Sequence, residues 1–116
     1  MMSLAESPEE FLANAVRNLA RPGDEALARM PEGDHRPNEL AIEFDEAYTE
    51  YVANLDQLPS VAQLESLQAL DAALAAMSGP ANVELWTESA VRGHPRWAEL
   101  RTLAHTAATR FGWLPT

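Results

Sequence analysis

The chain has 116 residues, 47% of them apolar, a composition that predicts one domain with a hydrophobic core and argues against intrinsic disorder. Its 18 acidic residues outnumber 8 basic ones, and the net charge of −10 argues against binding to nucleic acid or to anionic lipid. The absence of cysteine excludes disulfides and thiolate chemistry. With no recognisable signal peptide and no apolar run long enough to span a bilayer, we expect a cytoplasmic protein that does not bind membranes. Every basic residue is an arginine, which is typical of GC-rich genomes, and we expect a bacterial source.

Three helices are predicted in the first half of the chain. Ser7-Pro8-Glu9-Glu10 combines a capping serine, a proline suited to the first helical position and two carboxylates at the positive helix end. This helix should stop at Arg21-Pro22-Gly23, and Asp24 is expected to cap a short helix over residues 25–30. A polar loop follows, and apolar residues at helical spacing then predict a third helix from about Pro37 to Asp56.

The second half contains two further predicted helices with a less regular segment between them. Ser60 and Gln63 form the pattern of a capping box, and the helix they begin should end at Ser78-Gly79-Pro80. Its many alanines favour helix and should let neighbouring helices approach closely. Residues 82–92 are ambiguous, whereas the last helix should start at His94-Pro95 and end at Gly112.

No stretch alternates as a strand would, so the predicted fold class is all-α. Most connections are short, and short connections make successive helices antiparallel neighbours. We therefore expect residues 1–116 to form a single compact antiparallel bundle of about four main helices plus one or two short ones. Residues 1–6 and 114–116 are expected to fray.

The acidic residues are concentrated in the first half of the chain. Residues 1–58 hold 13 acids and 4 arginines, whereas residues 59–116 hold 5 acids and 4 arginines. On the third predicted helix, four glutamates recur at i, i+4, i+7 and i+11, a spacing that places them in one stripe beside the apolar face. The members of this stripe, called the glutamate row below, are Glu39, Glu43, Glu46 and Glu50.

Four like charges in one row are tolerable if the row is solvated, and otherwise three kinds of cation could lie over it. One is the protein's own basic C-terminal part, in which Arg96, Arg101 or Arg110 could pack against the row. The second is a divalent metal ion, because Glu43-x-x-Glu46 is a carboxylate spacing suited to magnesium. The third is a basic partner protein attracted by the negative field.

The metal interpretation uses Glu39, Glu43 and Glu46 together with Asp71 of the next helix, and predicts a divalent-metal-dependent helical hydrolase. The next predicted helix offers no second carboxylate pair of this spacing, because Glu65 is followed three residues later by a glutamine instead of an acidic residue. A di-iron site would need Glu-x-x-His pairs on core helices, and the one such spacing lies in the loop at residues 32–35. This interpretation remains the alternative, and we expect no cofactor.

The preferred hypothesis is a non-catalytic acidic protein-binding module. Its size, charge and lack of catalytic motifs are those of an inhibitor, such as an antitoxin or an immunity protein, that neutralises a basic partner. The large aromatic side chains either fill the core between the helices or anchor an interface, and Trp86 is the tryptophan expected to be exposed and to act as such an anchor. The expected contact residues are the glutamate row, Asp34 and His35 in the preceding loop, and Trp86. A structural subunit that associates with its own copies is a further alternative.

Overall fold

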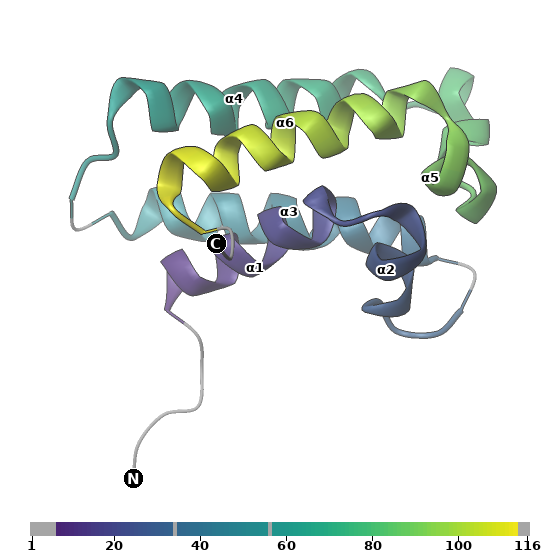
Figure 1. The fold of residues 1–116 in the computed structure, drawn as a ribbon, viewed down its shortest axis with the longest axis horizontal. Coiled ribbons are helices and arrows are strands. Elements are labelled where there is room, and N and C mark those ends of the chain that lie inside the picture. The colour runs from purple at the N-terminus through teal and green to yellow at the C-terminus, as the bar shows by residue number, and fades with distance from the viewer. Residues whose placement is uncertain (1–6, 34, 56, 114–116) are drawn as a thin grey trace, which may run out of the picture.

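The computed structural model describes residues 7–33, 35–55 and 57–113, and every regular element in these ranges is a helix (Figure 1). The expected all-α class is confirmed. The expected fraying concerns residues 1–6 and 114–116, which lie outside the described residues. In chain order the elements are α1 (Pro8–Ala20), α2 (Gly23–Ala28), α3 (Arg36–Ala53), α4 (Val61–Ala76), the 3-10 helix η1 (Pro80–Trp86), α5 (Glu88–Gly93) and α6 (Pro95–Phe111).

Side-chain caps explain the starts of four helices, α1, α4, α5 and α6. The Ser7 hydroxyl accepts a hydrogen bond from the Glu10 amide (3.2 Å), and the Ser60 hydroxyl accepts one from the Gln63 amide (3.1 Å), so both predicted caps are present. At the start of α6, His94 Nδ1 accepts from the Arg96 amide at 3.0 Å. These side chains satisfy amides that have no partner inside the helix.

Three boundaries differ from the expectations. α2 begins at Gly23, so Pro22, which has no capping side chain, occupies the N-cap position, and Asp24 lies inside the helix and pairs with Arg92. α3 ends at Ala53, before the expected end at residue 56, which lies outside the described residues. The ambiguous segment at residues 82–92 contains the end of η1 and most of α5, joined at Thr87, whose hydroxyl caps α5.

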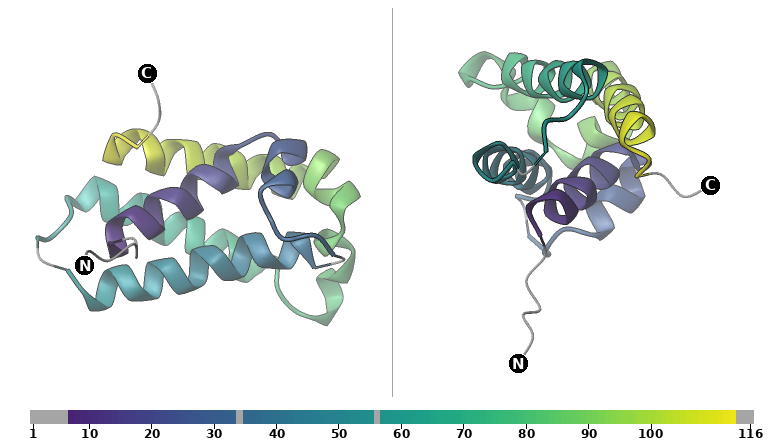
Figure 2. Two further views of the ribbon diagram at one scale, coloured as in Figure 1. Left: turned by 90° about the horizontal axis from the view of Figure 1, so that it is seen from below. Right: turned by 90° about the vertical axis from the view of Figure 1, so that its left-hand side faces the viewer.

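The four long helices run alongside one another, and the chain reverses direction from each one to the next (Figures 1 and 2). Their closely packed pairs are α1 with α3, α1 with α6, and α4 with α6. Although α3 and α4 follow each other in the chain, their backbones do not pack closely, contrary to the expectation for successive helices. The bundle therefore has three closed sides and one wider side.

Side-chain size explains why these sides differ. α6 buries Ala104, Ala107 and Ala108 completely, and such small side chains let neighbouring helices approach closely. On α3, by contrast, the rings of Phe44 and Tyr48 stack with centroids 5.5 Å apart. Both rings lie towards α4, and they occupy the space that a closer approach of α3 to α4 would need.

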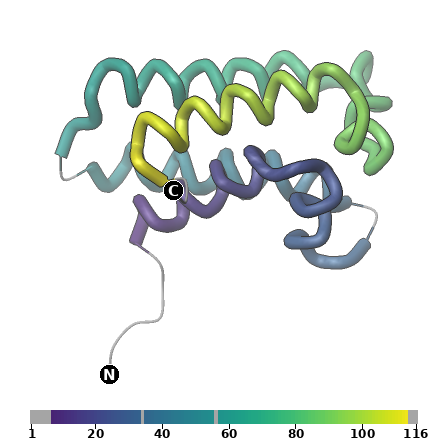
Figure 3. The backbone as a smooth tube through the Cα atoms, in the orientation of Figure 1, coloured from purple at the N-terminus to yellow at the C-terminus, as the bar shows by residue number. Residues whose placement is uncertain are grey.

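The short elements α2, η1 and α5 gather at the end of the bundle opposite the α3–α4 connection (Figure 3). Two ion pairs hold this end together, Arg36 with Glu88 at 2.8 Å and Arg92 with Asp24. Gly23 of α2 is buried directly against the backbone of α5. Within the described residues, no helix is both long and apolar enough to cross a membrane.

Candidate functional site

The glutamate row lies on the flank of α3 that faces α1. Each glutamate of the row directly precedes a residue of the buried face of α3, and successive helical residues are turned by about 100°. Glu43 is half-buried and accepts a hydrogen bond from the Asn18 side-chain amide of α1 at 2.9 Å. The side-chain oxygen of Asn18 (Oδ1) in turn accepts a hydrogen bond from Arg21 Nε at 3.3 Å. Asn18 thus links a guanidinium to the Glu43 carboxylate, and Glu43 joins α1 to α3.

The other members of the row are free of ion pairs within the described part of the chain. Glu46 and Glu50 are exposed and Glu39 is half-exposed, and no arginine lies within ion-pair distance of them. The interpretation that the C-terminal arginines neutralise the row is therefore wrong. Arg101 donates to the Val91 carbonyl and Arg110 to the Ala62 carbonyl, each at 3.0 Å, because these arginines lie on α6, away from α3.

The remaining expected contact residues do not adjoin the row as a group. His35 is exposed and occupies the N-cap position of α3 without a capping hydrogen bond from its side chain. Asp34 lies outside the described residues. Trp86 is half-buried rather than fully exposed, and its indole N–H donates to the Met77 carbonyl at 2.8 Å. It stands beside Ile42, on the opposite flank of α3 from the glutamates.

The four carboxylates of the metal interpretation are also divided between these two flanks. Asp71 of α4 lies with Asp45 of α3 on the side that faces away from α1, whereas Glu39, Glu43 and Glu46 lie on the α1 side. Among the residues that the structure describes, no three histidine, aspartate or glutamate side chains are grouped closely enough to hold a metal ion. The expected ligand set is therefore not assembled.

The wider side of the bundle forms a groove between α3 and α4 that the sequence reasoning did not predict. This α3–α4 groove encloses about 290 Å³. Its floor contains Phe44 and Leu74, which are 0% and 7% exposed, and carboxylates stand at its edges. The pKa of the nearby Tyr48 is raised by burial and, to a smaller extent, by the negative charge of Asp71. The lining residues are Ala41, Ile42, Phe44, Asp45, Asp71, Leu74, Ala75, Ser78 and Trp86.

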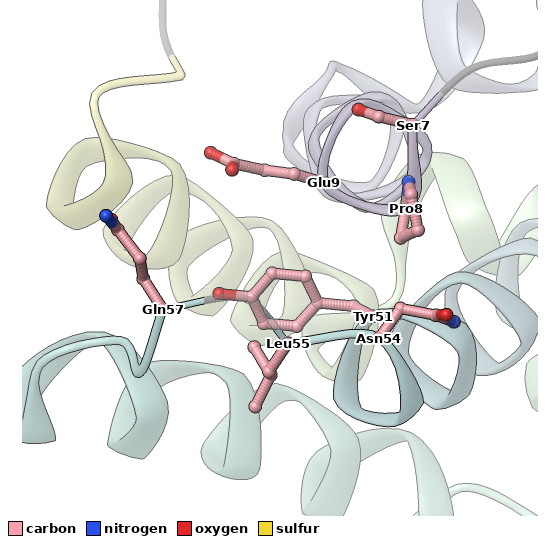
Figure 4. Close-up of a pocket in the computed structure, with 7 residues that line it drawn as sticks. All are labelled: Ser7, Pro8, Glu9, Tyr51, Asn54, Leu55 and Gln57. Carbon is pink, nitrogen blue, oxygen red and sulfur yellow. The ribbon is translucent and has the colours of Figure 1, made fainter.

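A second cavity of about 400 Å³ lies between the start of α1 and the end of α3 (Figure 4). Burial raises the pKa of the Tyr51 phenol there, and the carboxylate of Glu9 raises it further. Two polar side chains of this cavity already serve the backbone, since Ser7 caps α1 and the Asn54 side chain donates to the Glu50 carbonyl at 2.8 Å. No hydrogen bond joins the Tyr51 phenol to Glu9 or to another described residue of the cavity, so the phenol is not paired there with a base.

Comparison with protein-family models, with curated proteins and with solved structures finds no match to this chain. The features of the described chain that bear on function are the two flanks of α3. One flank carries the glutamate row, and the other forms a wall of the α3–α4 groove.

Proposed function

We propose that this protein is a non-catalytic, cytoplasmic binding module that engages a basic protein through the exposed side of α3. A small inhibitor of the antitoxin or immunity type is the kind of protein that these features suit. The observation that carries the proposal is the charge of α3. From Pro37 to Ala53 the helix has five carboxylates and no basic residue, and its one arginine, Arg36, is paired with Glu88 of α5.

Electrostatics favour a partner of opposite charge at this surface. Like charges at i, i+4 on a helix destabilise it by a few tenths of a kcal/mol per pair, and no basic side chain of the described chain forms an ion pair with the row. A basic partner would relieve the repulsion, and the field of a strongly acidic protein would accelerate its approach. Because Glu43 is engaged with Asn18, the partner-facing members of the row are Glu39, Glu46 and Glu50.

The test is a pull-down from lysate of the native host at low and high salt, with bound proteins identified by mass spectrometry. Glu46→Lys with Glu50→Lys reverses two exposed charges of the row. Glu65→Lys with Glu99→Lys reverses two exposed charges on α4 and α6 and serves as the control, because both double variants change the net charge equally.

We expect wild type and the control to retain the same basic protein at low salt and to release it at high salt, since exposed charge contacts are screened by salt. The row variant should fail to retain it. Equal retention by both double variants would contradict a contact through α3, and an equal loss in both would show that only net charge matters. Absence of a salt-sensitive basic protein from the wild-type sample would contradict the proposed function itself.

A further inference from the structure

We propose that the α3–α4 groove receives an apolar side chain from an amphipathic helix of the basic partner. This inference rests on the proposed function and adds to it the manner of binding. The groove adjoins a second hollow of about 350 Å³, and the two share Ala41, Ile42, Ser78 and Trp86. They therefore form one channel along α3, open to solvent, with the side chain of Ile42 46% exposed in its wall.

The walls of the groove are held in place before any partner binds. The hydrogen bond from the Trp86 indole to Met77 and the edge-to-face contact of Trp86 with Trp97, at 5.5 Å between centroids, fix the tryptophan ring. Phe44 is stacked on Tyr48 beneath the groove. Since its polar N–H is already bonded, Trp86 offers an apolar surface, and a preformed apolar site loses little conformational entropy on binding.

The shape of the groove favours a side chain over a small-molecule ligand. The channel is open to solvent along α3, whereas pockets for small molecules enclose most of the ligand surface. The walls of the groove come from two helices that run in opposite directions, an arrangement suited to an amphipathic helix that lays its apolar face into a groove. Addition of a strand is disfavoured, because the described residues form no sheet edge.

The charges at the groove identify the chemistry of the partner. Asp45 is exposed and Asp71 is half-exposed at its edges, and none of the described residues that line either hollow is basic. Arginine or lysine side chains that flank an apolar anchor on a helix would meet these carboxylates. A second copy of this chain would bring the same two aspartates against its own groove, so a basic helix is the complementary occupant.

The probe is a tryptophan-free helical peptide with leucines along one face and arginines on both flanks of that face. A peptide of the same composition, with its leucines distributed around the helix, controls for charge. A third peptide of arginine and alanine lacks the apolar anchor. Titration calorimetry measures affinity, while indole N–H and backbone chemical shifts report on Trp86 and on the groove.

The decisive variant is Ala75→Phe, which adds a ring at an exposed position lining the groove. Ala69→Phe is its matched control, because Ala69 is exposed on the same helix and lines neither hollow. Circular dichroism and thermal denaturation verify that both variants are folded. We expect Ala75→Phe to weaken binding of the amphipathic peptide by about tenfold or more, as expected for loss of a buried anchor, and Ala69→Phe to leave it unchanged.

Equal affinity of the two alanine variants for the amphipathic peptide, or chemical shift changes confined to residues outside the groove, would overturn the inference. So would a dimer in light scattering that Ala75→Phe dissociates, because the occupant would then be a second copy. The proposed function is tested separately by the Glu46→Lys, Glu50→Lys variant. If that variant loses the arginine–alanine peptide while Ala75→Phe binds the amphipathic peptide normally, the acidic surface stands and the groove inference fails.

Discussion

The contact between α2 and α5 allows a prediction about stability. Replacement of glycine by alanine should destabilise the protein at Gly23 but not at Gly93. A Cβ atom at Gly23 would lie 2.8 Å from the Val91 carbonyl oxygen and 2.9 Å from the Arg92 Cα, and both are backbone atoms that cannot rotate away. Gly23→Ala therefore forces α2 and α5 apart and loosens the Asp24–Arg92 ion pair. At Gly93 an added Cβ would meet no atom within 4 Å.

The magnitudes follow from comparing crowding with helix propensity. Overpacking of a close contact costs about 1–3 kcal/mol, whereas alanine in place of a helical glycine gains at most about 1 kcal/mol. Gly23→Ala should therefore lower the free energy of unfolding by about 1–2 kcal/mol. Gly93→Ala should leave it unchanged or raise it by up to about 1 kcal/mol. At a shift of about 4 °C per kcal/mol, the melting temperatures of the two variants should differ measurably.

The assay is urea and thermal denaturation of wild type and both variants, followed by far-ultraviolet circular dichroism. A Gly23→Ala protein as stable as wild type would refute the close approach of α2 to α5. Equal losses in both variants would refute the argument from crowding, because Gly93 has open space around it.

Two further predictions concern α3. Glu43→Ala should lower the free energy of unfolding by about 1 kcal/mol, because Asn18 loses its charged acceptor, while Glu46→Ala should change it by less than about 0.5 kcal/mol. Equal effects in urea denaturation would contradict the structural role of Glu43. The second concerns Tyr48. In the folded state, burial and the negative charge of Asp71 raise the pKa of its phenol above the ordinary value of 10.0. The unfolded chain then loses its proton first, so stability should fall as the pH rises past 10.0 towards the raised pKa. Tyr48→Phe should reduce this fall, leaving the contribution of Tyr51, and an unchanged dependence of melting temperature on pH would contradict the argument.

The helices could be predicted because their signals are local. Ser7, Ser60 and His94 lie next to the amides that they cap, and Gly112 adopts the left-handed conformation (φ 73°) that ends α6. Apolar spacing also identified the buried face of α3 and hence the flank on which the glutamate row lies. These features depend on residues within about one turn of each other, so no knowledge of the tertiary fold is needed.

Which helix covers which flank depends on contacts between distant residues. The four glutamates of the row are equivalent in the helical pattern, but Glu43 alone accepts a hydrogen bond from Asn18 of α1. The spacing of residues along α3 cannot show this contact. The alanines of α4 illustrate the same point. Their number predicts a close approach of neighbouring helices, but Ala69, Ala72, Ala75 and Ala76 are exposed, whereas three of the four alanines of α6 are buried.

An acidic, all-α chain with capped helices and a row of carboxylates along one of them could thus be predicted from the residues alone. Contacts between distant helices set the packing of α3 on α1 and its separation from α4, the position of Trp86 on the flank opposite the glutamates, and the groove between α3 and α4. Periodicity along a helix indicates how much of the helix is buried and on which side. The partner helix and its distance are set by the sizes of side chains brought together from distant parts of the chain.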